Sequence, residues 1–357
     1  MSFLSDFFAP KPKSVLGVDI GSSSLKVVQL KKEKGQAVLE TYGELALGPY
    51  GGAEIGQATN LSAEQITETL KDLLREAKVT SKNSALSIPY ARSLLTLVTL
   101  PYRKDPKEQK TVIELEARKY IPVPVSEVQL DWFVVPELAS PDTEAKTKET
   151  VQVLLVAVHN DELKLLQTIV EGAGLTASFY EIEIFSTIRA VVREPMKVSM
   201  VLDVGASTTK SYIVERGVVA LSHAISAGSQ DITRAISVSQ NLPIRSAEML
   251  KKQQGLSKQL GDSPELVFGR IFEEARRVLL QYETMHKKPV TAIVLTGGGG
   301  VTKELATYAK KFFSIDVQVA DPFAKTEAPA FMRPVLQEIG PEFSVAVGLA
   351  LRKLDEV

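Results

Sequence analysis

A short turn motif occurs twice in this chain, and the repeat constrains the fold more than any other feature. Residues 19–26 read Asp-Ile-Gly-Ser-Ser-Ser-Leu-Lys, and residues 203–210 read Asp-Val-Gly-Ala-Ser-Thr-Thr-Lys. An apolar, strand-like run stands before and after each copy, at 14–18 and 27–30 and at 198–202 and 211–214. Each copy therefore predicts two strands joined by a tight turn. A single Asp-x-Gly turn is common in proteins, whereas two copies in matching contexts predict two related hairpins.

The residue types in both turns suit the binding of a polyphosphate. Glycine lets the backbone approach a phosphate without a Cβ in the way, and successive N–H groups in a turn form an anion-binding concavity. The Ser and Thr hydroxyls add donors, and the lysine that ends each turn is a positive charge for phosphate. Asp19 and Asp203 could hold Mg²⁺ through water, as Mg²⁺ prefers. Two such tips facing each other could clamp one polyphosphate from both sides.

A third element has the glycine content of a ligand-binding loop. Residues 292–295 read as a buried strand that ends in Thr296-Gly297-Gly298-Gly299-Gly300, and a helix is expected from 301 to 313. Glycines between a strand and a helix permit close approach to a flat ligand or a phosphate. A flexible loop without a ligand is the alternative interpretation.

These three pieces, in this order and spacing, resemble the actin-like ATPase superfamily. The resemblance implies an α/β, ribonuclease H-like fold of two lobes, with ATP or ADP and Mg²⁺ in a cleft between them. It implies that the two turns are the phosphate loops, that Asp19 and Asp203 face the metal, and that the glycine element contacts adenosine. The matching positions are Asp19, Gly21, Ser22, Ser23, Ser24 and Lys26 in the first loop, Asp203, Gly205, Ser207, Thr208 and Thr209 in the second, and Gly297, Gly298 and Gly299 in the adenosine element.

Composition narrows the remaining possibilities. A net charge of −1 argues against a broad nucleic-acid-binding or membrane-binding face. The absence of cysteine excludes disulfides and thiolate chemistry, and three scattered histidines do not suggest a metal cluster. No apolar run reaches the roughly 18–20 residues of a membrane span, and the N-terminus lacks the pattern of a signal peptide.

Patterning along the chain predicts four parts. These are an N-terminal arm (1–13), a first lobe (14–92 with 178–197 and 343–357), an inserted subdomain (93–177) and a second lobe (198–342). The arm either packs on its own fold or serves as a docking peptide for a membrane or a partner. Within the inserted subdomain we expect three strands, two helices including 160–172, and a polar loop at 136–149.

Two further stretches narrow the resemblance. The placement of the inserted subdomain before the second phosphate loop resembles FtsA rather than actin. Residues 113–124, Ile-Glu-Leu-Glu-Ala-Arg-Lys-Tyr-Ile-Pro-Val-Pro, and residues 128–132, Val-Gln-Leu-Asp-Trp, resemble the PilM family. FtsA ends in a linker and an amphipathic membrane-targeting helix. Residues 351–357 show neither, so we expect no direct membrane anchor there.

The PilM resemblance implies a function and a location. Such a protein is an ATP-binding cytoplasmic adaptor of type IV pilus assembly, held at the inner membrane through a protein partner. Its partner is the cytoplasmic N-terminal peptide of PilN, docked between the first lobe and the inserted subdomain, with pilus motor ATPases as further contacts. Residues 120–124, an apolar and proline-rigid edge, could lie near that groove, although core packing of Ile121 and Val123 is an equal alternative.

Two pairs of charged residues complete the expected site. Glu248 and Lys251 stand three apart on a predicted helix face and resemble the residues that reach ribose and base in FtsA and PilM; a surface ion pair is the alternative. Glu181 and Glu183 stand where the superfamily places the group that orients the attacking water. Both could instead be solvated charges at a strand end, which would leave hydrolysis slow or absent.

Two other functions fit the same superfamily. An FtsA-like cell-division ATPase would form nucleotide-dependent filaments. A sugar or acyl-phosphate kinase would need a general base beside the acceptor hydroxyl, and the sequence offers no Asp in a suitable context.

Overall fold

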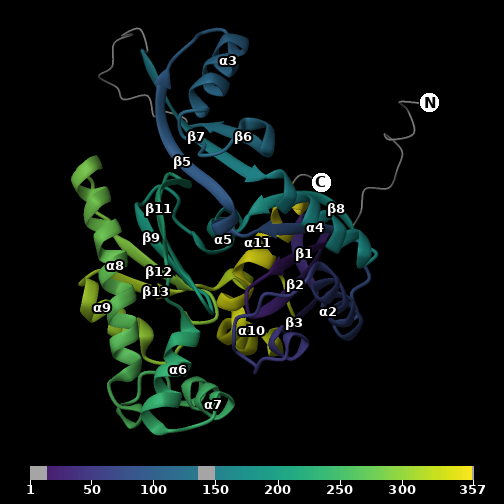
Figure 1. Ribbon diagram of the computed structural model, residues 1–357, viewed down its shortest axis with the longest axis vertical. Coiled ribbons are helices and arrows are strands. Elements are labelled where there is room, and N and C mark those ends of the chain that lie inside the picture. Colours follow the sequence, from purple (N-terminus) through teal and green to yellow (C-terminus); the bar gives the residue numbers. More distant parts are fainter. Residues whose placement is uncertain (1–13, 136–148, 356–357) are drawn as a thin grey trace.

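The computed structural model describes residues 14–135 and 149–355 (Figure 1). The expected N-terminal arm and nearly all of the polar loop at 136–149 lie outside these residues. Within them, the strands form two five-stranded sheets and one three-stranded sheet. No helix in the described ranges is both long enough and apolar enough to cross a membrane.

The first sheet contains the first predicted hairpin. Its strand order is β3-β2-β1-β4-β8, and Asp19 lies opposite Lys26 in the antiparallel β1–β2 pair. β4 runs parallel to β1, and β8 runs parallel to β4. The strands are β1 (Ser14–Ile20), β2 (Ser24–Glu33), β3 (Gln36–Ala46), β4 (Asn83–Ile88) and β8 (Thr176–Ile182). β8 was not predicted from the sequence.

The second sheet repeats this arrangement. Its order is β11-β10-β9-β12-β13, with an antiparallel three-strand meander followed by two parallel strands. Lys210 lies opposite Asp203 here, as Lys26 lies opposite Asp19 in the first sheet. The strands are β9 (Ser199–Val204), β10 (Thr209–Glu215), β11 (Val218–Ile225), β12 (Ala292–Thr296) and β13 (Asp316–Val319). Both predicted hairpins are therefore present and related.

The third sheet is separate from the other two and projects beside β11 (Figure 1). β7 (Thr150–His159) lies between β5 (Ser93–Pro101) and β6 (Val128–Val134), and all pairs are antiparallel. Helix α3 (Pro106–Ala117) begins with Asp105 as N-cap and Pro106 in its first turn. Its buried Ile113 and Ala117 share a small core with alternate residues of the three strands.

Helix α4 (Asn160–Gly172) belongs to the first lobe, which corrects its grouping with the inserted subdomain. Its Ile169 and Val170 are buried with Leu70 and Leu73 of α2 (Ala63–Glu76), under the first sheet. α4 follows β7 directly, but its apolar stripe is buried against the first lobe and not against the core around α3. The predicted capping box of α2, between Ser62 and Gln65, is present.

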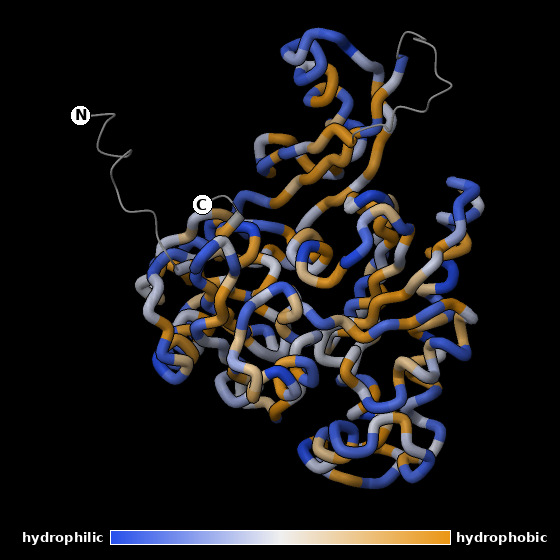
Figure 2. Tube along the Cα trace, turned by 180° about the vertical axis from the view of Figure 1, so that it is seen from behind, coloured by the Kyte–Doolittle hydropathy of each residue, from blue (hydrophilic) through white to orange (hydrophobic). Residues whose placement is uncertain are grey.

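The remaining helices cover the sheets. In the second lobe they are α6 (Ser229–Gln240), α7 (Ile244–Gln254), α8 (Ser263–His286) and α9 (Leu305–Phe313), and in the first lobe α5 (Glu183–Val191), α10 (Arg333–Ile339) and α11 (Ser344–Asp355). α9 begins four residues later than the expected start at 301. α11 packs against α5 so closely that a Cβ on Gly348 would lie 1.9 Å from the Ser186 carbonyl oxygen. Figure 2 shows hydrophobic segments running through the interior of both lobes.

Candidate functional site

A cavity of about 950 Å³ lies between the two lobes. Both predicted phosphate turns line it, together with α7, the glycine-rich turn after β12 and the 3₁₀ turn Gly340–Phe343. The lining residues that the sequence predicted are Asp19, Gly21, Ser22, Ser23, Ser24, Lys26, Glu183, Asp203, Gly205, Ser207, Thr208, Glu248, Lys251, Gly297 and Gly298. Residues more than 270 positions apart in the sequence thus meet at one site.

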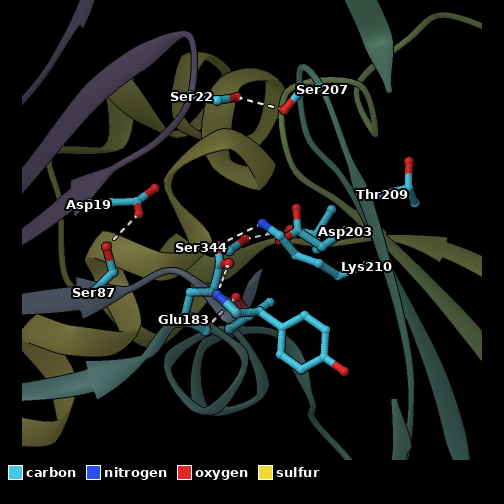
Figure 3. A network of polar contacts seen from close by, with 12 residues as sticks. Asp19, Ser22, Ser87, Glu183, Asp203, Ser207, Thr209, Lys210 and Ser344 are labelled. Atoms are coloured by element: carbon cyan, nitrogen blue, oxygen red, sulfur yellow. Dashed lines mark hydrogen bonds and ion pairs between the residues drawn. The ribbon is translucent and has the colours of Figure 1, made fainter. Parts of the chain in front are cut away.

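The two hairpin tips have the same geometry and meet each other. The Gly21 N–H donates to the Ser24 carbonyl over 3.1 Å, and the Gly205 N–H donates to the Thr208 carbonyl over 3.1 Å. The Ser207 hydroxyl donates to the Ser22 hydroxyl over 3.2 Å (Figure 3). Each tip therefore presents a short turn of backbone N–H groups and hydroxyls to the cavity, which is the donor set that binds phosphate oxygens.

Lys210 is shared between two carboxylates at the base of the second hairpin. Its Nζ lies 2.6 Å from Glu183 Oε2 and 3.1 Å from Asp203 Oδ2 (Figure 3). Burial alone would lower the pKa of Lys210, but the two carboxylates outweigh it, and the pKa is raised. Burial raises the pKa of Glu183, against the charge of Lys210. The lysine thus stays cationic at any working pH and faces the cavity with both partners.

The first hairpin carries a matching pair of charges in a different arrangement. The Ser87 hydroxyl donates to Asp19 Oδ1 over 2.8 Å, and burial raises the pKa of Asp19. Lys26 Nζ lies 3.1 Å from Glu44 Oε1 on β3, and not against Asp19. The carboxylate of Asp19 is therefore oriented by a neutral hydroxyl and is not in direct contact with Lys26, although the charge of Lys26 still favours its ionised form.

A metal at this site would depend on ligands besides the protein. Among the described residues, no group of three His, Asp or Glu side chains is arranged to hold a metal ion. Mg²⁺ keeps several waters and takes one or two carboxylates plus phosphate oxygens. Asp19 and Asp203 suit that pattern, because both carboxylates line the cavity beside the phosphate turns.

The glycine-rich turn brings the backbone close to the second hairpin. Gly297 has φ +79°, and a Cβ there would lie 2.4 Å from Asp203 Oδ1. Gly298 lines the cavity beside Glu342. Gly299 does not line the cavity; its N–H donates to the Val204 carbonyl over 2.8 Å, so its role is to fasten the turn to β9.

Glu248 and Lys251 both line the cavity and contact each other. Their charged atoms are 2.7 Å apart, and both side chains are buried. The Thr233 hydroxyl donates to Glu248 Oε2 over 2.6 Å. Burial lowers the pKa of Lys251, against the opposing effect of Glu248. The pair is thus a buried, hydrogen-bonded unit on the cavity wall, unlike the surface ion pair that the sequence left open.

Two expected site residues point elsewhere. Thr209 is buried, its hydroxyl donates to the Ala227 carbonyl over 2.8 Å, and it does not line the cavity; Figure 3 shows it apart from the other labelled side chains. Glu181 is held by Arg189 through contacts of 2.7 and 2.9 Å and by Arg352 at 2.7 Å. Glu181 therefore fastens α5 and α11 to β8 and is not placed to orient a water in the cleft.

In the segment at 120–124, two side chains contribute to a hydrophobic core. Ile121 is buried in the core of the inserted subdomain, and Val123 packs partly against it. The proline-flanked segment therefore contributes these two side chains to folding, which was the alternative that the sequence left open.

Several lining residues were not predicted. Glu44, Lys252 and Glu342 come from β3, α7 and the turn before α11, and all three line the cavity. Burial and the neighbouring Glu44 raise the pKa of Glu342 to about 7. No local motif marks these positions, because they meet only when the lobes pack together.

The paired sheets and the facing hairpins in the cleft define a protein of the actin-like ATPase fold. The family model for "Type IV pilus assembly protein PilM" matches residues 17–354. The chain therefore belongs to the PilM family of type IV pilus assembly proteins, which confirms the resemblance seen in the sequence.

The chain is similar in sequence or structure to several known proteins. A solved "PilM-PilN type IV pilus biogenesis complex" is 26% identical with a TM-score of 0.80, covering 97% of this chain and 99% of that one. The cell division protein FtsA of Neisseria meningitidis serogroup B is 25% identical over 375 residues, covering 93% of this chain and 88% of FtsA. MreB5 of Spiroplasma citri bound to AMPPNP has the same fold, with a TM-score of 0.55 and 13% identity over 97% of this chain and 98% of that one.

Proposed function

We propose that this pilus assembly protein binds ATP with Mg²⁺ in the cleft between its lobes and docks the cytoplasmic N-terminal peptide of PilN. It would act as a cytoplasmic adaptor at the inner membrane, held there by its partner, with pilus motor ATPases as further contacts. The observation that carries the nucleotide part is the meeting of the two phosphate turns, Ser22 to Ser207, across a cavity lined by both.

The volume and the charged lining of the cavity support a nucleoside triphosphate as its ligand. Its volume of about 950 Å³ is in the range of small-molecule and cofactor sites. The cavity wall offers the backbone donors of both turns with Lys26 and Lys210, and also Gly298 and the buried Glu248–Lys251 pair. A ligand that carries a polyphosphate, a sugar and a flat base suits this combination of donors, charges and exposed glycine backbone.

Partner docking has support from the same cavity and from similarity. The cavity continues from the phosphate turns to Arg92, at the entry to the inserted subdomain, and to Glu162 and Leu165 on α4. An exposed leucine thus lines the cavity together with two charged side chains, and protein–protein interfaces combine an apolar core with a polar rim in this way. The similar solved structure is a complex with PilN, so we place the PilN peptide along this part of the cavity.

Hydrolysis in this arrangement would be slow. Glu183 is the carboxylate nearest to the role of orienting water, but its oxygens already contact Lys210 and the Tyr90 N–H, the latter over 2.7 Å. A carboxylate engaged in this way is a poor acceptor for a further water proton. Bound ATP would then act mainly by stabilising one arrangement of the lobes, through its different affinity for the open and closed forms.

ATP binding by matched variants tests the nucleotide part. Asp203→Asn should weaken binding of Mg·ATP by at least about tenfold, which is about 1.4 kcal/mol, because it removes a carboxylate beside both the metal position and Lys210. Asp316→Asn changes an exposed carboxylate on β13, outside the cavity, and should leave the affinity unchanged. Equal affinity in all three proteins would show that the cleft is not the nucleotide site.

A further inference from the structure

We infer that Tyr90 couples the nucleotide site to the inserted subdomain, through a closed ring of contacts that joins Lys210, Glu183, Tyr90 and Ser222. The inference rests on the proposed nucleotide binding and adds how that binding would reach the partner groove.

Tyr90 occupies the short turn through which the chain passes from β4 of the first sheet into β5 of the inserted subdomain. β4 ends at Ile88, the 3₁₀ turn spans Tyr90–Arg92, and β5 of the inserted subdomain begins at Ser93. The Ser93 hydroxyl donates to the Tyr90 carbonyl over 2.9 Å, and the Arg92 N–H donates to the Pro89 carbonyl over 3.0 Å. The turn is thus internally hydrogen-bonded, so a displacement of Tyr90 moves the start of β5 with it.

Two contacts hold this turn to other parts of the protein. The Tyr90 N–H donates to Glu183 Oε1 over 2.7 Å, at the start of α5. The Tyr90 hydroxyl lies 3.0 Å from the Ser222 hydroxyl on β11. The backbone of Tyr90 is therefore fixed to the first lobe, while its ring reaches the second lobe.

Both contacts of Tyr90 connect it to β10 of the second phosphate hairpin. The other oxygen of Glu183, Oε2, lies 2.6 Å from Nζ of Lys210 on β10. Ser222 pairs with Tyr212 in the β10–β11 ladder, two residues beyond Lys210. β10 begins directly after the second phosphate turn, so the turn that receives phosphate and the turn that carries the inserted subdomain share one set of contacts.

A phosphate on the hairpin tips changes the electrostatic balance of this ring. Lys210 lines the cavity and is shared by Glu183 and Asp203. An anionic phosphate attracts Lys210 and repels both carboxylates, and these effects are large in a poorly solvated site. Glu183 then contacts Lys210 less closely, and its bond to the Tyr90 N–H changes with it, because both bonds are made by one carboxylate.

A displacement of the Tyr90 turn also affects the groove between the first lobe and the inserted subdomain. Arg92, two residues after Tyr90, lies 3.9 Å from Glu162 of α4 across that groove. A shift of the 3₁₀ turn alters the spacing of Arg92 and Glu162, and so the width available to a peptide. The ring thus offers a route by which phosphate occupancy changes partner docking, with a reciprocal effect of the partner on nucleotide affinity.

The test measures amide hydrogen exchange at residues 90–97 in the full chain, with and without saturating Mg·AMPPNP. Tyr90→Phe and Ser222→Ala each remove one hydroxyl of the ring and keep the Glu183–Lys210 pair. Tyr50→Phe is the matched control, because it removes a tyrosine hydroxyl that donates to Asp72, outside the cavity. The nucleotide affinity of every protein is measured in the same samples.

Coupling predicts that nucleotide changes exchange at 90–97 by about fivefold or more in the unaltered chain and in Tyr50→Phe. In both ring variants the change at residues 91–97 should fall below about twofold, at an affinity within about threefold of the unaltered chain, because a turn loosened from Glu183 then has no Tyr90–Ser222 contact to draw it toward the second lobe. An undiminished change in both variants would overturn the coupling, and so would bound nucleotide with no change at 90–97 in the unaltered chain. Failure of the unaltered chain to bind nucleotide would instead overturn the proposed nucleotide site, and the coupling with it.

Discussion

The Ser207 hydroxyl lies 3.2 Å from the Ser22 hydroxyl, although 185 residues separate them in the chain. Each serine stands at the tip of a hairpin that ends in a lysine and begins with an aspartate. The contact therefore brings two equivalent donor turns to the same place in the cavity wall.

Gly297→Ala should damage both stability and nucleotide binding. Its positive φ costs a non-glycine residue about 1–2 kcal/mol, and the new Cβ would also meet Asp203 Oδ1 and the Val204 carbonyl oxygen. We expect a further loss of about 1–3 kcal/mol in the free energy of unfolding and at least about tenfold weaker ATP binding. Denaturant unfolding and ATP titration measure the two effects.

Gly52→Ala is the control for Gly297→Ala. Gly52 has φ +69° with no atom within 4 Å of the added Cβ, so only the backbone strain is reproduced. ATP binding should then be unchanged. If Gly297→Ala behaved like Gly52→Ala in both measurements, Gly297 would not support Asp203.

Glu181→Gln should destabilise the fold without altering ATP affinity. The change removes the buried charge that Arg189 and Arg352 contact. Both arginines are partly exposed, so we expect a loss of about 1–3 kcal/mol in the free energy of unfolding, below the roughly 3–5 kcal/mol of a fully buried pair. Glu68→Gln, which alters an exposed pair with Lys71, should change stability by less than about 0.5 kcal/mol. A Glu181→Gln protein of normal stability but without ATP turnover would restore the catalytic role.

The Glu181 carboxylate should also make the stability of the protein depend on pH. Burial opposes the ionisation of Glu181, but Arg189, Ser186 and Arg352 outweigh it, and the pKa is lowered from 4.5. A lowered pKa in the folded state contributes stability that is present above pH 4.5 and is lost as the pH falls through the folded value. The stability gap between the unaltered chain and Glu181→Gln should therefore shrink on acidification, as unfolding at a series of pH values would show.

Glu342 should give the opposite dependence. Burial and Glu44 raise its pKa from 4.5 to about 7, so its contribution to stability is complete below pH 4.5 and declines as the pH rises to 7. Relative to Glu342→Gln, the unaltered chain should lose about 1–3 kcal/mol between pH 5 and pH 8. Glu273→Gln, at an exposed position of α8, should follow the unaltered chain. A parallel profile for Glu342→Gln would show that Glu342 is not titrating.

Leu165→Glu should weaken PilN-peptide binding and spare ATP binding. Leu165 lines the cavity next to the inserted subdomain and is 39% exposed. Placing a charge on an apolar anchor typically costs 2 kcal/mol or more, so we expect about a thirtyfold loss in peptide affinity. Leu280→Glu, at a 51% exposed leucine on α8, is the control. Equal peptide affinity in both variants would place the partner elsewhere.

The sequence predicted those parts of the molecule that are local. Each phosphate hairpin is a contiguous strand, turn and strand, and the α2 capping box lies within four residues. Thr209 and Gly299 belong to correctly predicted motifs, yet they point away from the cavity, because alternation along a strand and the path of a turn decide which neighbour faces the ligand. Belonging to a predicted motif therefore did not distinguish residues that line the cavity from residues that do not.

What the sequence did not predict depends on packing between distant segments. Glu181 and Glu183 stand two residues apart at the end of β8 and the start of α5, and only the position of α11 with Arg352 shows that the first is structural. Helix α4 has an ordinary amphipathic pattern that does not indicate which sheet it covers. Glu342 becomes a cavity residue only when the turn before α11 meets β3 and α7.

One measurement tests the central claim most directly, namely that one chain holds both ATP and a partner peptide. Purified protein is titrated with Mg·ATP, and the ATP-saturated protein is then titrated with a synthetic peptide of the PilN cytoplasmic N-terminus. The account predicts saturable binding of one equivalent of each, with ATP still bound at peptide saturation. Absence of saturable ATP binding, or release of ATP in proportion to bound peptide, would contradict it.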